Sequence, residues 1–351
     1  MQRALKSALH LLVSLSFGAI APCAWSQLAP EKTYFGINRP IRVQANVPAE
    51  IAAKGSGEAR VDLYEPQGTS PLVSSPIVAG SVDLAQTFPQ LWTNASPKVL
   101  YAQLTVGGEK VGAPLVLQPL IAPKRATLLQ PETREPWVYD SVKGRANFDV
   151  NTAEVAWIND PPLFTGMRVY VDQHVVIRTS VGEVEVRLRP DKAPNTVWNF
   201  HELVRGGYYS DTIVHRIVPK LPSGDPFVVQ FGDPTGTGMG GPGYDIRLEP
   251  SDLPHDFGVL SMARGPEPDT AGSQVFLCLS RRGCALLDGL YTSFAQTVKG
   301  AETIEMLVKQ PVDGDRPKDP PKITEIVLVD APPFGTGPGP IQPKLDAAPA
   351  R

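Results

Sequence analysis

The chain has 351 residues, enough for two domains of ordinary size. Hydrophobic residues make up 42% and charged residues 20%, which is typical of a globular protein, and the net charge of −3 gives no basic footprint for nucleic acid. We therefore expect no nucleic-acid partner. The 37 prolines and 31 glycines favour a turn-rich, mainly β chain over a helical bundle.

The first 26 residues have the pattern of a secretory signal peptide. Arg3 and Lys6 supply a positive start, an apolar run follows, and a small-bulky-small motif ends at Ser26. The apolar run is short for a bilayer, and no later segment is long enough to span one. We expect cleavage, export to the periplasm or the exterior, and no membrane span afterwards. A lipid anchor at Cys23 is disfavoured because Pro22 stands where a small residue is wanted.

Residues 27–121 alternate short β-like runs with turn residues, the pattern of a small β-sandwich. The strand candidates are IRVQANV, ARVDLYE, LVSSPIVAGSVDL and VLYAQLTV. Gly107-Gly108 predicts a turn after the last of them. No catalytic side chains gather in this region, and the sequence does not identify its partner.

Residues 122–168 are polar and interrupted by prolines. They predict a linker with one strand near 153–158. At the other end of the chain, residues 332–351 contain too few apolar side chains to form a core. This composition predicts a disordered tail.

Between the linker and the tail, residues 169–331 have the clearest pattern. The runs 175–179 and 183–188 alternate with period two and are joined through Val181-Gly182, which predicts a hairpin. A final strand is expected over 322–329.

Two helices are expected in the same region. The first starts at a cap formed by Asn195 and ends at Gly206-Gly207. The second follows Gly300. The side chains expected to face inward from the two helices are Val197, Phe200, Leu203, Val204, Ile304, Leu307 and Val308. Many short strands with two helices predict a closed antiparallel barrel capped at its ends.

The candidate chemistry lies in two stretches, IVHRIVPKLPSGDPFVVQFGDPTGTG (213–238) and GVLSMARGPEPDTAGSQVFLCLS (258–280). The first sets Arg216 and Gln230 among β-branched and aromatic residues. Neither stretch contains a nucleophile–base pair or a metal-ligand cluster. A permanently charged guanidinium beside an apolar wall suits a site that polarises a neutral peptide carbonyl.

From about 175 to 329 the sequence resembles a cyclophilin-type peptidyl-prolyl cis-trans isomerase. The matching segments are VGEVEVRLRPDKAPNTVWNF, VHRIV, FVVQFGDPTGTGMGGPGY, GVLSMAR, AGSQVFL and LLDG, followed by Tyr291 and SF. Each segment alone is a weak signal, and their order makes the match specific. The resemblance implies a cyclophilin-like barrel and leaves the N-terminal β region outside it.

The resemblance also implies roles for single residues. Arg216 matches the catalytic arginine, and Gln230 matches the glutamine that orients it. The implied substrate-binding residues are Phe227, Val228, Phe276 and Leu287 on the walls of the proline pocket and Ala263, Arg264 and Gln274 on its rim. Tyr291 replaces a histidine found in many members, and Leu286 replaces a tryptophan found in some, which implies weak binding of cyclosporin. KLPSGDP (220–226) is longer than the usual link and is expected to lengthen a loop beside the site.

Other motifs are interpreted structurally. The glycines of GTGMGG match GxGxxG formally, but Pro242-Gly243 follows where a helix is needed, so a loop is expected. Asp313-Gly314-Asp315 predicts a turn, and His215 is interpreted as a packing residue. The histidines are scattered, so no metal or other cofactor is expected. Cys278 and Cys284 are either core thiols or one disulfide, and the sequence leaves this open.

These observations predict an exported isomerase that acts on proline-containing proteins or peptides and assists their folding. The alternative is a non-catalytic proline-peptide-binding or chaperone module that docks through its N-terminal β domain. Acceleration of prolyl isomerisation separates the two. Client proteins and oligomeric state stay open.

Overall fold

The computed structural model describes residues 27–47, 59–121, 125–129, 134, 154–158 and 163–342. The predicted signal peptide, most of the linker and the last nine residues lie outside these ranges. Within them, none of the helices has both the length and the apolar character needed to cross a membrane.

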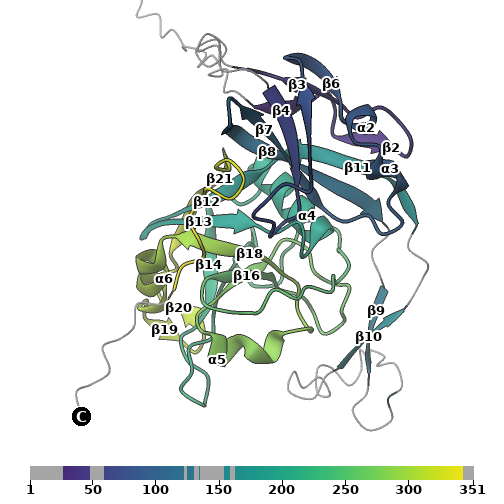
Figure 1. The fold of residues 1–351 in the computed structure, drawn as a ribbon. Coiled ribbons are helices and arrows are strands. Elements are labelled where there is room, and N and C mark those ends of the chain that lie inside the picture. Colours follow the sequence, from purple (N-terminus) through teal and green to yellow (C-terminus); the bar gives the residue numbers. More distant parts are fainter. Residues whose placement is uncertain are drawn as a thin grey trace, which may run out of the picture.

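The N-terminal region contains two antiparallel sheets that share one hydrophobic core (Figure 1). The larger sheet has six strands in the spatial order β2 (Tyr34–Gly36), β11 (Phe164–Val171), β8 (Glu109–Ile121), β7 (Leu100–Val106), β4 (Ala59–Tyr64) and β5 (Val73–Ile77). The smaller sheet has three, in the order β1 (Leu28–Pro30), β3 (Arg42–Ala45) and β6 (Gly80–Asp83). Two single-turn helices, α2 (Leu84–Thr87) and α3 (Gln90–Thr93), follow β6. The predicted sandwich and the glycine turn at Gly107 are confirmed.

The predicted linker boundary at residue 168 is wrong. β11 runs across it and pairs with β8 and β2, so the last strand of the larger sheet lies between the expected linker and the barrel. A separate two-stranded antiparallel sheet of β9 (Arg125–Leu129) and β10 (Glu154–Ile158) lies within the linker range, which confirms the strand predicted there. The change of domain therefore falls between β11 and β12, near Asp172.

The prediction of a disordered tail is also wrong over the described part, 332–342. Phe334 is 6% exposed and lies against the sheet face that points away from the sandwich core. Its ring centroid is 4.5 Å from that of Tyr64 and 5.1 Å from that of Tyr101. Ile341 packs on the barrel core, and its N–H donates to the carbonyl of Thr297 at 2.9 Å. Apolar contacts at Phe334 and Ile341 thus hold a segment that is rich in proline and glycine.

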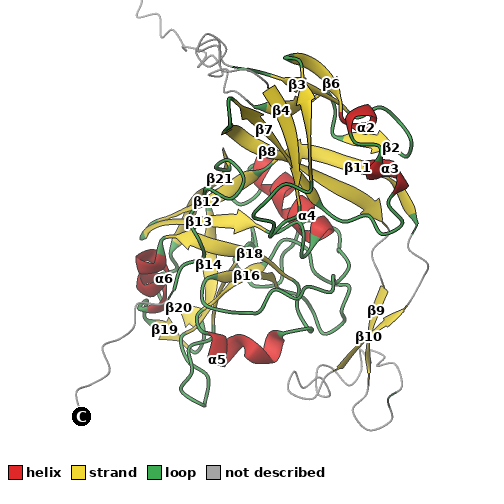
Figure 2. Ribbon diagram, viewed as in Figure 1, coloured by secondary structure: helices red, strands yellow, loops and turns green. Residues whose placement is uncertain are grey.

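Residues 173–330 form a closed antiparallel barrel, as predicted. Its eight strands, in spatial order, are β12 (Gln173–Thr179), β13 (Gly182–Leu188), β18 (Ser293–Lys299), β16 (Val259–Met262), β17 (Val275–Cys278), β15 (Val228–Phe231), β14 (Thr212–Val218) and β21 (Lys322–Asp330). β12 pairs with β21 to close the ring, and Thr179 faces Gly182 across the predicted hairpin. Figure 2 shows the strands with short connecting elements around them. These are α5 (Arg281–Cys284), η1 (Ala285–Leu287), β19 (Val312–Asp313) and β20 (Arg316–Pro317).

Two longer helices pack on the barrel, α4 (Pro194–Arg205) and α6 (Ala301–Val308). α4 buries Val197, Phe200 and Val204 in the barrel core and ends before Gly206, as predicted. The predicted cap at Asn195 is wrong, because Asn195 lies inside the helix. Its backbone N–H and that of Thr196 donate instead to the carboxylate of Glu249, at 3.1 and 2.7 Å. A buried carboxylate from a distant loop therefore caps the helix.

α4 also lies at the boundary between the two β regions (Figure 1). Its Trp198 packs against Tyr170 of β11, with ring centroids 5.0 Å apart. The guanidinium of Arg168 lies 4.6 Å above the Trp198 ring. Together with Phe334, these contacts join the sandwich to the barrel through an aromatic layer.

Candidate active site

The site begins with the register of three neighbouring strands. On β14, β15 and β17, Arg216 is directly opposite Gln230, and Gln230 is directly opposite Phe276. Because side chains opposite each other on adjacent strands share a sheet face, the cation, the amide and the ring lie on one face. The alternation in β14 buries the flanking Ile217 in the barrel core. The sequence pattern that builds the barrel thus also places the candidate groups together.

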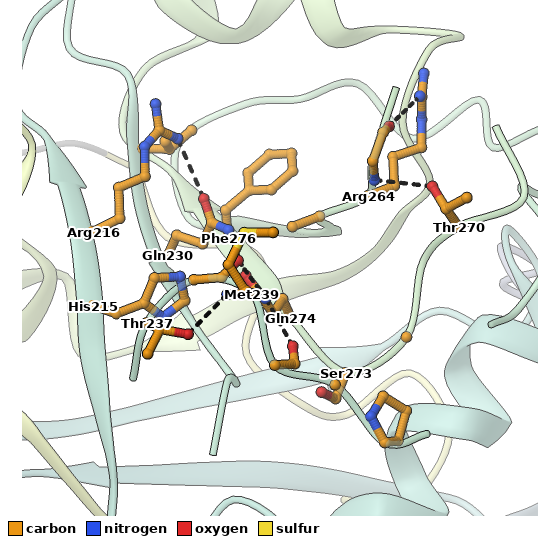
Figure 3. Close-up of a pocket in the computed structure, with 18 of the residues that line it drawn as sticks. His215, Arg216, Gln230, Thr237, Met239, Arg264, Thr270, Ser273, Gln274 and Phe276 are labelled. Carbon is orange, nitrogen blue, oxygen red and sulfur yellow. Dashed lines mark hydrogen bonds between the residues drawn. The ribbon is translucent and has the colours of Figure 1, made fainter. Parts of the chain in front are cut away.

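A chain of hydrogen bonds holds the polar side of the site (Figure 3). Arg216 Nη1 donates to Gln230 Oε1 at 3.2 Å, and Gln230 Nε2 donates to Gln274 Oε1 at 2.8 Å. Gln274 Nε2 then donates to the carbonyl oxygens of Gly238 and Gly240, at 3.0 and 2.9 Å. In each glutamine the amide oxygen accepts one hydrogen bond and the amide nitrogen donates onward. The chain therefore fixes the orientation of the Arg216, Gln230 and Gln274 side chains.

These groups line one open cavity of about 1250 Å³. Its lining includes all but one of the eleven predicted site residues, namely Arg216, Phe227, Val228, Gln230, Ala263, Arg264, Gln274, Phe276, Leu287 and Tyr291. The exception is Leu286 on η1, which is half-buried and packs against the apolar wall behind the cavity. The predicted residues are thus brought together, with one placed behind the wall rather than in it.

The apolar wall is built around Phe276, which is 5% exposed. Tyr291 meets it edge-on, with ring centroids 5.8 Å apart at 80°. Arg264 lies 4.6 Å above the Tyr291 ring, and its guanidinium donates to the carbonyl oxygens of Leu290, Gly265 and Pro266. The Arg264 head group therefore supports the rim through backbone contacts.

The glycine-rich segment after β15 is the loop that the sequence predicts, and it forms another side of the cavity. The Asp233 carboxylate organises it by accepting from the N–H groups of Thr235 and Gly238, at 2.7 and 2.6 Å. Burial raises the pKa of Asp233, but these hydrogen bonds outweigh it and hold the pKa at about 2. At Gly240 a Cβ atom would lie 2.0 Å from Asp233 Oδ1, so this close approach requires glycine.

The other residues singled out in the sequence have packing roles. His215 is buried, and burial lowers its pKa, which fits the expected packing role and leaves it neutral at pH 7. Cys278 and Cys284 are buried free thiols behind the apolar wall. The 220–226 loop packs on α5 through a 2.7 Å bond from Ser280 Oγ to Pro226 O and does not line the cavity. Among the described residues, no group of three or more His, Cys, Asp or Glu could hold a metal ion.

Several lining residues were not predicted from the sequence. Asp315 and Arg316 reach the cavity from the β19–β20 turn, and Thr237, Met239 and Tyr244 reach it from the glycine-rich segment. The Asp-Gly-Asp motif correctly predicts a turn at 313–315, where Gly314 has a φ of +63°. The motif does not reveal what the turn faces.

The geometry defines a class of site: a fixed cation and two amides beside an apolar pocket on a closed β-barrel. Comparison with known proteins identifies the family. Residues 174–328 match the family described as cyclophilin type peptidyl-prolyl cis-trans isomerase/CLD. Peptidyl-prolyl cis-trans isomerase ppi1 of Schizosaccharomyces pombe is 38% identical over 163 residues, which cover 44% of this chain and 99% of that protein. A peptidyl-prolyl cis-trans isomerase of Synechococcus elongatus is 39% identical over 141 residues, covering 40% of this chain and 90% of that protein.

Other relatives are larger proteins. Peptidyl-prolyl cis-trans isomerase-like 2 of Rhizopus delemar is 39% identical over 183 residues, and the chain spans only 33% of its length. Among solved structures, a cyclophilin-type isomerase of Cryptosporidium parvum, crystallised in the presence of the dipeptide Ala-Pro, is 35% identical with a TM-score of 0.41. It covers 45% of this chain and 100% of its own. The chain belongs to the cyclophilin-type peptidyl-prolyl cis-trans isomerase family, and residues 174–328 are the part that matches the family.

Proposed function

We propose that this protein accelerates cis-trans rotation about Xaa-Pro peptide bonds in proline-containing proteins and peptides. One observation carries the proposal: the Arg216 guanidinium lies in the cavity, held by Gln230, beside the wall that contains Phe276. No covalent intermediate and no proton transfer are needed for this reaction. A site with one fixed cation and an apolar wall therefore contains the groups that the chemistry requires.

The physical basis is the resonance of the amide. Partial double-bond character in the C–N bond gives a rotation barrier of about 18–20 kcal/mol. When the bond twists, the nitrogen lone pair localises, and the twisted state becomes more sensitive to nearby charge. A preorganised donor held beside the proline nitrogen, within reach of the proline's own carbonyl, stabilises the localised lone pair and favours that state by roughly 3–4 kcal/mol. Arg216 can supply this donor through the N–H groups of its planar guanidinium.

The apolar wall has two roles in this proposal. The rings of Phe276 and Tyr291, with Leu287 beside them, offer a surface for the proline ring. A proline ring seated on this surface would exclude water from that side of the site, and electrostatic stabilisation is stronger where water is excluded. The Gln230–Gln274 chain prevents the polar groups from reorienting during the reaction.

The test is a rate measurement on a tetrapeptide that contains one Ala-Pro bond, by two-dimensional NMR exchange between its cis and trans resonances. The protein should raise the exchange rate in proportion to its concentration. Shifted peptide resonances without faster exchange would reject the isomerase and identify a binding module instead.

We also propose that the isomerase is exported and assists the folding of other exported proteins, a process that prolyl isomerisation can limit. The support is the sequence pattern of residues 1–26, a positive start followed by an apolar run and a small-bulky-small motif ending at Ser26. Cell fractionation followed by mass spectrometry of the N-terminus tests this proposal. We expect a mature N-terminus at Gln27 in the exported fraction; an intact chain recovered only from the cytosol would contradict it.

A further inference from the structure

The β19–β20 turn lies against the strand that carries Arg216. Ile217 N–H, next to Arg216 on β14, donates to the backbone carbonyl of Asp315 at 2.7 Å. On its other side, Arg316 Nη1 donates to the Gly236 carbonyl at 3.1 Å. The turn is therefore tied both to β14 and to the glycine-rich segment, and Asp315 has a fixed backbone position at the edge of the cavity.

The Asp315 side chain contacts the candidate catalytic group directly. Its Oδ2 accepts from Arg216 Nε at 2.6 Å, while Gln230 accepts from Nη1. A guanidinium is a rigid planar fork, so one hydrogen bond leaves it able to pivot and two bonds on different nitrogens define its plane. Within the described part of the chain, no hydrogen bond engages the third nitrogen, Nη2.

The Arg216–Asp315 ion pair is too exposed to contribute much to folding stability. The Arg216 and Asp315 side chains are 38% and 56% exposed. Ion pairs this open to water contribute little to folding stability. The contact therefore adds little to folding stability, although it engages an arginine that lines the cavity.

We propose that Asp315 is a positioning residue for the isomerase reaction. It acts through Arg216: the carboxylate and the Gln230 amide clamp two of the guanidinium nitrogens and present Nη2 to the substrate carbonyl. This inference rests on the proposed function. The inference adds Asp315 to the residues that act in the proposed reaction. The surrounding sequence, Asp-Gly-Asp, predicts only a turn at this position.

The test compares Asp315→Ala and Asp315→Asn with Asp313→Asn. Asp313 is the matched control because it is an exposed acid in the same turn and does not line the cavity. Asp315→Ala should lower kcat about tenfold with KM nearly unchanged, since a displaced catalytic group loses transition-state contact first. Asp315→Asn keeps an oxygen acceptor and should lose less. Asp313→Asn should match the wild type, and all three variants should unfold at the wild-type urea midpoint.

A spectroscopic signature reports the clamp without any assay of turnover. The Arg216 Nε–H resonance, assigned by its loss in Arg216→Lys, should exchange with water faster in Asp315→Ala than in the wild type or Asp313→Asn. Equal kcat in Asp315→Ala and Asp313→Asn, or an unchanged Nε–H resonance, would overturn the inference. So would a fall in the urea midpoint that accompanies the loss of kcat. If the wild type itself shows no isomerase activity, the proposed function fails, while the resonance still decides whether Asp315 holds Arg216.

Discussion

The packing of the segment after the barrel makes a strong prediction about stability. Phe334 is 6% exposed between Tyr64 and Tyr101, and its backbone is held separately. Its N–H donates to Gln103 Oε1 at 2.7 Å, and its carbonyl accepts from Lys110 Nζ at 2.7 Å. Phe334→Ala leaves both of these bonds in place and removes only the ring.

The expected cost follows from that geometry. Replacing a buried phenylalanine by alanine costs roughly 3–5 kcal/mol, and part of this comes from the ring-to-ring contacts. Because the ring covers a sheet face near the surface, we expect the lower end, about 3 kcal/mol. Urea unfolding followed by tryptophan fluorescence measures it, and Trp198 in the adjoining aromatic layer serves as a local reporter.

Val78→Ala is the control, because Val78 is 84% exposed and should change the free energy of unfolding by less than about 0.5 kcal/mol. Equal free energies of unfolding for Phe334→Ala and Val78→Ala would refute the reasoning. That result would mean that the Phe334 ring contributes no packing.

Two further predictions concern buried carboxylates. Burial raises the pKa of Asp172 to about 7 in the folded protein, so the unfolded chain ionises this group first as the pH rises. The contribution of Asp172 to folding stability is therefore fully present below about pH 4 and is lost as the pH rises through 7. Asp172→Asn should therefore gain stability relative to the wild type between pH 4 and pH 8 in urea titrations, and a pH-independent difference would contradict this. Glu249→Ala leaves the N–H groups of Asn195 and Thr196 without their acceptor and should cost about 2 kcal/mol by the same method. The exposed Glu267→Ala is its control, and an equal effect in both variants would argue against the cap.

The barrel is predictable from the sequence because its determinants are local. Period-two alternation defines the strands, and Gly206-Gly207 ends α4. The family resemblance then places Arg216 and Gln230 in one cavity, where the structure has them. The roles given to these residues stay predictions until turnover is measured.

The features missed by sequence analysis depend on partners far away in the chain. The cap of α4 is Glu249, 54 residues from Asn195, so the polar residue nearest the helix start was the wrong choice. Phe334 is ordered by tyrosines more than 200 residues earlier, which composition cannot reveal. Asp315 meets Arg216 across 99 residues. In each case the local pattern is compatible with several outcomes, and only the tertiary contact selects one.

Turnover of Arg216→Ala tests the central claim most directly. With the fold intact by urea unfolding, kcat/KM for cis-trans exchange of the Ala-Pro tetrapeptide should fall by about 10²–10³. Arg216→Lys keeps the charge but loses the fork that Gln230 and Asp315 hold, so it should recover only part of that loss. Wild-type turnover in Arg216→Ala would contradict the account.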